Sequence, residues 1–316
     1  MTEPVTRPAR PFRFGAIVRS ASRAKEWADT VRRAEDLGYS ALLVSDHLDG
    51  QLAPFAALAS AAALTSTIRL GSYVFAAGLR HPALLAGEAA SIDVLCDGRF
   101  ELGLGAGWES AEYRKLGLDF DPLPVRLEQL AEALAVVRAC FAGEPFTFTG
   151  AHHRVVELSG LPRPAQSPGP RILIAGGGRR VLGFAAREAD IVGLGAKALV
   201  DGTGIDLGDI TAAATDRKIA WIRESAGSRW PRLELNAIVF AVDPDPDRPA
   251  AAERLAGVYG QPAAALLESP HVLLGSVDDV CDQLRERRER WGISYICVFQ
   301  DDMEAFAPVV DRLAER

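Results

Sequence analysis

The chain is poor in cysteine and histidine, the residues on which most structural metal sites depend. Only 4 Cys and 5 His occur among its 316 residues. The histidines offer no metal-ligand spacing, since His152 and His153 are adjacent and have no partner at helical distance, and the cysteines contain no C-x-x-C pair. Widely spaced cysteines of this kind favour buried, reduced thiols. We therefore expect no metal site, and structural packing roles for Cys96, Cys140, Cys281 and Cys297.

Positive charge is also scarce relative to negative charge. The 35 basic residues are outnumbered by 42 acidic residues, which gives a net charge of −7. This balance argues against nucleic acid or an anionic membrane as the main partner. No apolar run reaches the ~18 residues that a membrane-spanning helix needs, and the N-terminus lacks the apolar stretch of a signal peptide. We expect a cytoplasmic protein whose partner is a small molecule.

Signatures of several common enzyme classes are missing. The chain has neither a G-x-S-x-G nucleophile elbow nor a P-loop. Its glycine-rich segment Gly103–Gly107 does not have the spacing of the G-x-G-x-x-G dinucleotide fingerprint, and no acidic ribose-binding residue follows in the expected place. The fold must therefore be inferred from the order of its elements.

Short apolar strands alternate with amphipathic helices along almost the whole chain. The count favours a single (β/α)8 TIM barrel over an open doubly wound sheet, the remaining alternative. We expect a tail over residues 1–11 and one domain over residues 12–316. Insertions are expected after strands four, six and seven, at residues 143–170, 195–208 and 243–270. The eight predicted strands span residues 12–18, 41–44, 68–75, 100–104, 171–174, 190–194, 233–242 and 293–299.

Chemistry in such a fold lies just past the carboxyl ends of the strands. Asp46 and His47 directly follow the second strand, where an imidazole suits proton transfer near neutral pH and a carboxylate can hold or polarise a ligand. The alternative is that Asp46 caps a helix and that His47 is merely exposed. The residues alone leave both interpretations open.

Two glycine-rich turns also follow predicted strands. Gly105, Ala106 and Gly107 would let a flat ligand approach the backbone, although glycines that only ease packing at a barrel rim explain them as well. The turn from Ala175 to Gly178 opens a helix, whose free N–H groups favour an anion. Three glycines exceed what a simple turn requires, so we favour phosphate binding there.

The chain resembles the bacterial luciferase-like superfamily, and within it the deazaflavin (coenzyme F420) dependent oxidoreductases. The resemblance extends from about Phe12 to the C-terminus. Each motif is modest alone, but their order and spacing make the match specific. The segments that carry it are Arg32–Tyr39, Val44–His47, Leu70–Val74, Arg80–Pro82, Leu95–Trp108, Glu144–Pro145, Pro162–Pro164 and Ala175–Gly178.

The resemblance implies a dimeric (β/α)8 barrel with the cofactor at the carboxyl ends of the strands. Asp46 and His47 would flank the deazaflavin ring, with His47 as proton donor or acceptor. A bulge after the third strand would hold a non-prolyl cis peptide at Tyr73–Val74. The resemblance further implies cofactor contacts from Ser72, Tyr73, Val74, Gly105, Ala106, Gly107, Ala175, Gly176, Gly177 and Gly178.

One departure from the family bears on the substrate. Relatives that oxidise a sugar phosphate place a glutamate directly after the third glycine of the strand-four turn, where this chain has Trp108 and then Glu109. We therefore do not expect sugar-phosphate oxidation. We expect Glu109 to assist catalysis and Phe75, Trp108 and Lys197 to line a more apolar substrate pocket.

The resulting hypothesis is an F420-dependent oxidoreductase. A hydride would pass between the deazaflavin C5 and a substrate carbon, while His47 moves the matching proton. An FMN-dependent monooxygenase of the same superfamily is the first alternative. A barrel that binds a phosphate-bearing ligand without catalysis is the second.

Overall fold

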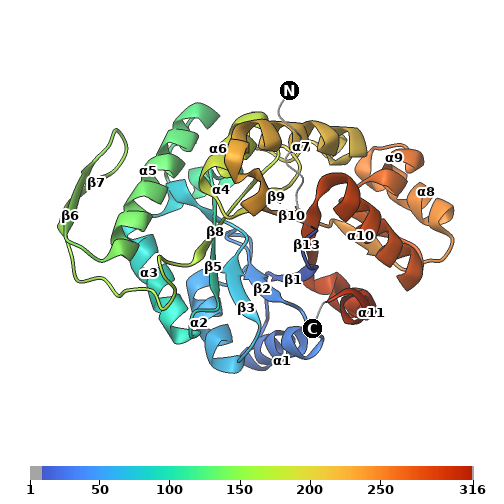
Figure 1. Ribbon diagram of the computed structural model, residues 1–316, viewed down its shortest axis with the longest axis horizontal. Coiled ribbons are helices and arrows are strands. Elements are labelled where there is room, and N and C mark those ends of the chain that lie inside the picture. Colours follow the sequence, from blue (N-terminus) through green and yellow to red (C-terminus); the bar gives the residue numbers. More distant parts are fainter. Residues whose placement is uncertain (1–8, 315–316) are drawn as a thin grey trace.

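Eight parallel strands close into a barrel in the computed structural model, which describes residues 9–314 (Figure 1). The circle closes because β1 pairs with both β2 and β13, and because β3 pairs with β5. An open sheet would leave two edge strands, so the predicted (β/α)8 barrel is confirmed. The strands are β1 (Arg13–Val18), β2 (Ala41–Val44), β3 (Arg69–Ser72), β5 (Phe100–Gly105), β8 (Arg171–Gly176), β9 (Ile191–Leu194), β10 (Glu234–Ile238) and β13 (Ile293–Phe299).

The strands are apolar on both faces because each face meets other side chains. Neighbouring residues of β2 illustrate the alternation: Leu42 packs in the layer between strands and helices, whereas Leu43 belongs to the cluster inside the barrel. The interior cluster also contains Ile17, Leu173 and Tyr295. The barrel is therefore a packed core, and ligands can only bind at its ends.

Helices surround the barrel on its outer side (Figure 1). Ser276 caps α10 through a capping box with Asp279, which satisfies backbone N–H groups at the start of this helix. The surrounding helices are α1 (Ala24–Asp36), α2 (Pro54–Leu64), α3 (Pro82–Leu95), α5 (Leu123–Ala142), α6 (Arg179–Glu188), α7 (Ala212–Ala226), α10 (Val277–Trp291) and α11 (Met303–Leu313).

The predicted insertions contain regular structure of their own. Residues 143–170 include an antiparallel hairpin, which extends away from the barrel beyond α5 (Figure 1). A parallel pair of short strands and two helices follow β10. The elements that belong neither to the barrel strands nor to the surrounding helices, inside or outside these insertions, are α4 (Ser110–Lys115), β6 (Phe146–Thr149), β7 (Arg154–Leu158), β11 (Ala241–Asp243), α8 (Arg248–Tyr259), α9 (Ala263–Glu268), β12 (Val272–Leu274), and the short 3-10 turns η1 (Ala77–Leu79), η2 (Leu207–Ile210), η3 (Gly227–Arg232) and η4 (Gln300–Asp302).

Two predicted strands are interrupted. The strand expected over residues 68–75 ends at Ser72, and the chain passes through a cis peptide at Tyr73–Val74 before the two-residue β4 (Phe75–Ala76). The cis peptide expected at this position is confirmed. The expected bulge is confirmed by the register, because the chain advances four residues from Gly71 to Phe75 while β5 advances three from Glu101 to Leu104. The strand expected over residues 233–242 breaks after Ile238, because the chain leaves the barrel and β11 pairs with β12 instead.

Glycines in β5 make room for this bulge. A Cβ atom at Gly103 would lie 2.0 Å from the Ser72 carbonyl oxygen, and one at Gly105 would lie 2.7 Å from the Val74 side chain. Any larger residue at either position would displace the third strand. The glycines of β5 therefore allow close packing at the barrel rim, which is one of the two explanations that the sequence left open. Gly105 also lines the cavity.

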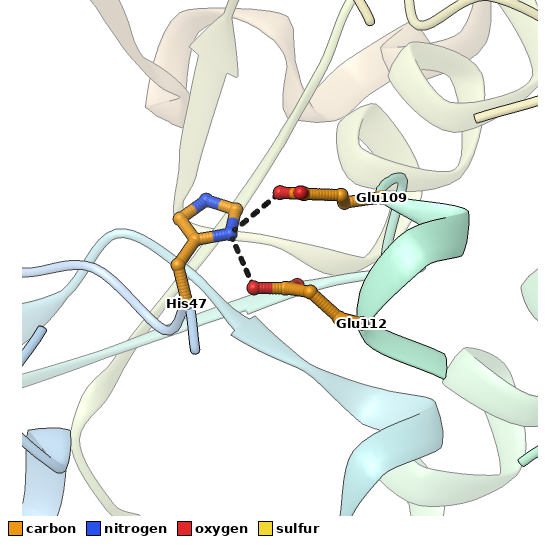
Figure 2. Close-up of side chains that lie close together, drawn as sticks. All are labelled: His47, Glu109 and Glu112. Atoms are coloured by element: carbon orange, nitrogen blue, oxygen red, sulfur yellow. Dashed lines mark hydrogen bonds and ion pairs between the residues drawn. The ribbon is translucent and has the colours of Figure 1, made fainter. Parts of the chain in front are cut away.

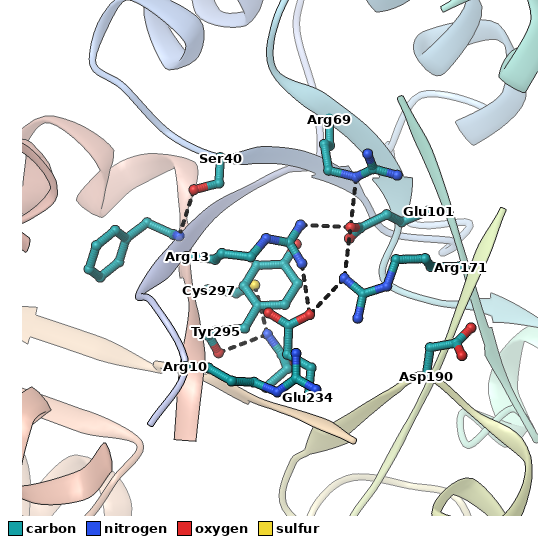
Figure 3. A network of polar contacts seen from close by, with 12 residues as sticks. Arg10, Arg13, Ser40, Arg69, Glu101, Arg171, Asp190, Glu234, Tyr295 and Cys297 are labelled. Carbon is teal, nitrogen blue, oxygen red and sulfur yellow. Dashed lines mark hydrogen bonds and ion pairs between the residues drawn. The ribbon is translucent and has the colours of Figure 1, made fainter. Parts of the chain in front are cut away.

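A cluster of buried charges closes the amino-terminal end of the barrel (Figure 3). Arg13 contacts Glu101 at 2.6 Å and Glu234 at 3.0 Å, and both carboxylates are almost fully buried. Arg69 and Arg171 complete the network, at 2.8 Å from Glu101 and Glu234 respectively. All five residues begin strands or stand one position inside them, so this cluster lies at the end opposite to the strand ends that carry the candidate site.

The expectations that remain concern the cysteines, the N-terminal tail and membrane-spanning helices. All four cysteines are free and buried, and burial raises the pKa of Cys140 to about 11 and of Cys297 to about 12. Most of the predicted tail, residues 1–8, and the last two residues lie outside the described residues. No helix between residues 9 and 314 combines the length and apolar character needed to cross a bilayer. The cytoplasmic location stays a prediction.

Candidate functional site

A cavity of about 700 Å³ opens at the carboxyl ends of the barrel strands. Its volume is in the range of pockets that hold cofactors and small substrates. The structure brings most of the predicted site residues together here, although they come from five different strand ends. Those that line the cavity are Asp46, His47, Tyr73, Val74, Gly105, Ala106, Gly107, Trp108, Ala175, Gly176, Gly177, Gly178 and Lys197.

Three predicted site residues, Ser72, Phe75 and Glu109, do not line the cavity, and the first two are buried in the protein. Phe75 is fully buried and stacks on Phe55 with ring centroids 4.4 Å apart, so its assignment to the substrate pocket is wrong. The bulge turns its side chain into the core. Ser72 is also buried, and its hydroxyl donates to the Gly103 carbonyl and accepts from the Gly103 N–H. It fastens β3 to β5 and does not face the cavity.

The Asp46 carboxylate is already engaged by the protein. It forms a bidentate ion pair with Arg80 and accepts the Ala76 N–H at 3.1 Å. The side chain of Asp46 is only 6% exposed, and that of Arg80 is 25% exposed. These contacts hold the segment after the bulge against the end of β2, so that Asp46 and Ala76 both line the cavity.

Two glutamates, Glu109 at the N-cap of α4 and Glu112 within it, lie on the same side of the His47 ring (Figure 2). Its Nδ1 atom is 3.1 Å from Glu112 Oε1 and 3.4 Å from Glu109 Oε2. Glu112 Oε1 also accepts the Leu48 N–H at 2.7 Å. The Trp108 ring meets the imidazole edge to face, with centroids 5.7 Å apart. The imidazole is thus held by hydrogen bonding on one side and by an aromatic ring on another.

Glu109 does not line the cavity, but its carboxylate contacts His47, which does. Burial raises the pKa of the Glu109 carboxyl, and repulsion from Glu112 raises it further. One atom from each of His47, Glu109 and Glu112 lies within 4.8 Å of the others. Because Glu112 Oε1 accepts the Leu48 N–H and also lies at hydrogen-bond distance from His47 Nδ1, we interpret the cluster as hydrogen bonded. The expectation of no metal stays a prediction.

Tyr73 and Val74 form one wall of the cavity on either side of the cis peptide. The Tyr73 hydroxyl donates to Asn236 Oδ1 at 2.8 Å, which fixes the ring against β10. Burial raises the pKa of Tyr73 well above its ordinary value, so the phenol stays neutral. Val74 presents its apolar side chain beside the glycines of β5.

The Ala175–Gly178 turn leads directly into α6. Gly178 is the N-cap of α6 and has no side-chain cap, and a Cβ atom there would meet nothing within 4 Å. The first N–H groups of a helix have no partner within it and attract anions. Gly177, by contrast, lies against the backbone of Ala196 and Lys197, where a Cβ atom would approach to 2.3 Å.

The arginines after this turn do not reinforce the anion site. Arg179 pairs with Glu224 at 3.1 Å on the exposed surface, and neither Arg179 nor Arg180 lines the cavity. Lys197 does line it, and its backbone borders the glycine turn. Lys197, expected in the substrate pocket, is therefore better placed to meet an anion at that turn.

Sequence reasoning missed several residues of the site. Glu112 is the most important, and it lies in a stretch to which we assigned no element. Glu109 and Glu112 are three residues apart, a spacing that would have placed both on one helix face. Other cavity residues outside the prediction include Arg19, Gln51, Leu123, Arg126, Leu199, Ile238 and Phe299.

Comparisons with known proteins agree with this architecture. The F420-dependent glucose-6-phosphate dehydrogenase of Microbacterium testaceum is 33% identical over 165 residues, which cover 49% of this chain and 49% of that protein. The chain spans about half the length of the curated relatives it matches.

Solved structures match over nearly the whole chain. The coenzyme F420 dependent tetrahydromethanopterin reductase of Methanopyrus kandleri has a TM-score of 0.76 at 17% identity, covering 96% of this chain and 100% of that one. The oxygenating constituent of 3,6-diketocamphane monooxygenase from Pseudomonas putida, in complex with FMN, has a TM-score of 0.72 at 17% identity, covering 96% and 98%. At such identities these structures share the fold.

A family model for luciferase-like monooxygenases matches residues 9–226, which is more than half of the sequence. Together with the closed barrel and the cavity at its carboxyl end, this match identifies the family. The chain belongs to the luciferase-like monooxygenase family.

Proposed function

We propose that the protein is an F420-dependent oxidoreductase that transfers a hydride between the deazaflavin and a carbon of an organic substrate. The observation that carries the proposal is the convergence of His47, the Tyr73–Val74 bulge and the Ala175–Gly178 turn on one cavity. A proton-transferring group, an apolar wall and an anion-binding turn are the parts that such a reaction requires from the protein. The F420-dependent relatives support this choice.

The residues of the cavity fit a flat, phosphate-bearing cofactor. Gly105, Ala106 and Gly107 leave the floor almost free of side chains, and Val74 borders it. The N-terminus of α6 at Gly178 would hold the phosphate, with Lys197 nearby. When bound there, the deazaflavin supplies the hydride chemistry, which no side chain can supply.

The chain itself would position the substrate and move a proton. His47 presents its imidazole to the cavity, and in alcohol oxidation it would take the hydroxyl proton, whereas in the reverse reaction it would return it. Asp46 and Arg80 keep the bulge in place beside it. The apolar lining would exclude water from the reacting atoms.

We further propose that the substrate is apolar and uncharged. Trp108, Leu123, Leu199 and Ile205 line the cavity. Arg126 offers no free charge, because its guanidinium donates to backbone carbonyls of the Gly107 turn and of Asp121. Secondary alcohols and the matching ketones should therefore turn over with F420, while glucose 6-phosphate should not. Comparable turnover of glucose 6-phosphate would contradict the apolar assignment.

Titration of the cofactor-free protein with F420 and with FMN tests the cofactor. We expect F420 to bind and FMN to bind much more weakly, as measured by fluorescence quenching and calorimetry. Tight FMN binding without F420 binding would overturn the proposal in favour of an FMN-dependent monooxygenase. That alternative is supported by the FMN complex among the structural neighbours.

We also propose that the protein is a homodimer. Leu84 and Leu95 stand three turns apart on one face of α3 and are 66% and 60% exposed. Burying this face against a second copy would remove apolar surface from water. Light scattering should give twice the chain mass, and Leu84→Lys with Leu95→Lys should give a monomer. A monomeric wild-type protein at micromolar concentration would contradict this.

A further inference from the structure

The cluster of His47, Glu109 and Glu112 contains an unequal pair of carboxylates. Both contact the same ring nitrogen, Nδ1, at 3.4 Å and 3.1 Å respectively (Figure 2). One ring nitrogen has one hydrogen to donate, so the two carboxylates cannot both accept a full hydrogen bond from it. Their roles must therefore differ.

Glu112 is the fixed member of the pair. Its side chain is 4% exposed, and the Leu48 N–H donates to the same oxygen that contacts His47. Because a backbone N–H can only donate, Glu112 Oε1 must act as an acceptor at this position. The shorter contact then requires a hydrogen on His47 Nδ1, which leaves Nε2 with its lone pair when the ring is neutral. Figure 2 shows no contact between this second ring nitrogen and either glutamate.

Glu109 is the variable member. Its side chain is 21% exposed, and it stands at the start of α4, one turn before Glu112. Burial, followed by repulsion from Glu112, raises the pKa of its carboxyl. Its charge therefore responds to pH, and it contributes attraction to a charged imidazole only when it is itself ionised.

Other charges around the ring are already paired. Asp49 and Lys115 form an ion pair at 2.7 Å on the adjacent surface. Asp46, which precedes His47, is held by Arg80. Trp108 covers the ring on a further side without charge. Within residues 9–314, Glu109 and Glu112 are thus the charged groups in direct contact with His47.

We propose that Glu112 is a positioning residue that fixes the tautomer of His47, and that Glu109 adjusts how readily the ring holds a second proton. The inference rests on the proposed function. In alcohol oxidation the substrate O–H bond would break as the Nε2–H bond forms, and the C–H bond of the same carbinol carbon would break as its hydride passes to the cofactor, which leaves a carbonyl group. The ring then carries a positive charge, which both carboxylates stabilise. In ketone reduction each of these bond changes runs in reverse, so the same arrangement serves both directions.

Nitrogen NMR of the cofactor-free protein tests the arrangement without any turnover. The chain has 5 histidines, and His47→Asn assigns the ring signals of His47 by their loss. We expect the neutral ring to carry its hydrogen on Nδ1 in the wild type. In Glu112→Gln the amide can donate as well as accept, so both tautomers should appear. A single unchanged tautomer in Glu112→Gln, or a wild-type ring protonated on Nε2, would overturn the positioning role.

The charge role of Glu109 has a matched control. Glu109→Gln should keep the Nδ1–H tautomer and reduce the fraction of doubly protonated His47 ring measured by NMR at one fixed pH, since one attractive charge is lost. Asp49→Asn removes a nearby carboxylate that does not touch the ring, and it should change that fraction less. Equal changes in the two variants would remove the specific role of Glu109.

Kinetics separate this inference from the proposed function. With F420 and a secondary alcohol, Glu112→Gln should lower kcat by roughly 10- to 100-fold with little change in KM, because binding is intact and only the proton transfer is misaligned. Glu112→Asp should recover part of the loss. If the NMR results hold and F420 does not bind, the proposed function fails and the tautomer assignment stands. If F420 turns over and the NMR results fail, the inference alone is overturned.

Discussion

Removal of the Asp46 carboxylate tests whether this residue serves the fold or the cofactor. Asp46→Ala deletes a bidentate ion pair with Arg80 and the acceptor of the Ala76 N–H. Breaking a buried pair costs about 3 to 5 kcal/mol because the remaining charge loses its partner. Arg80 keeps some access to water, since it is 25% exposed. We therefore expect a loss near the lower limit, about 3 kcal/mol of unfolding free energy.

Urea unfolding followed by circular dichroism measures this loss. With an m-value of ~3 kcal/mol/M, the midpoint should fall by about 1 M. Asp46→Asn keeps an acceptor for Ala76 and should lose less. The double variant Asp46→Ala with Arg80→Ala should cost less than the sum of the two single variants, because they remove the same interaction.

The opposite pattern would refute the reasoning. If Asp46→Ala stays within 1 kcal/mol of the wild type and F420 affinity collapses, the carboxylate serves the cofactor directly. The resemblance to the family implies that Asp46 flanks the deazaflavin ring, whereas its position after a strand end alone left a capping role open. The structure adds that both carboxylate oxygens are already engaged by the protein.

Three further predictions concern the glycine turn, the buried histidine and the charged cluster. Gly178→Asp adds a carboxylate in open space at the N-cap of α6, so the thermal stability of the protein should not fall. The F420 affinity of Gly178→Asp should fall because the carboxylate repels the phosphate, whereas the F420 affinity of Gly178→Ala should change little. Unchanged F420 affinity in Gly178→Asp would show that this turn does not bind the phosphate. Burial lowers the pKa of His271 to about 3, so the folded protein favours the neutral imidazole. The unfolding free energy should therefore decrease as the pH falls below 6.5, by about 3 kcal/mol at pH 4. Urea titrations of His271→Asn should show a smaller decrease over the same pH range. Glu101→Ala at the opposite barrel end should cost about 3 kcal/mol or more in unfolding free energy without changing F420 affinity, and a matching loss of affinity would contradict the separation of the two ends.

The fold was predictable because the signal for a barrel is repeated along the chain. Strand-sized apolar segments such as Ala41–Val44 and Ile293–Phe299 recur between helices, and an error at one boundary does not change the count. The exceptions have local causes. Residues 233–242 contain enough apolar side chains for one long strand, but the chain bends after Ile238 to pair with β12, a long-range contact that periodicity cannot reveal.

Site residues were predictable where position alone decides their role. His47, Trp108 and the glycine turns follow strand ends, so a parallel barrel must bring them to one rim. Phe75 failed because its direction depends on the bulge. The resemblance indicated that a bulge exists. The direction of the Phe75 side chain after the bulge depends on packing against Phe55, which lies in the preceding helix α2.

Glu112 marks the limit of reasoning from strand ends. It belongs to a six-residue helix in a loop, and its importance comes from two donors that other segments aim at one oxygen: the Leu48 N–H and the His47 ring. A sequence shows which residues can accept hydrogen bonds, but it does not show which acceptors are already occupied. Asp46 and Glu112 are both carboxylates near the end of β2, and only their partners distinguish them. Arg80 neutralises the first, whereas the second is left to orient an imidazole. The assignment of catalytic and supporting roles among such residues therefore depends on hydrogen-bond partners, which only the folded chain defines.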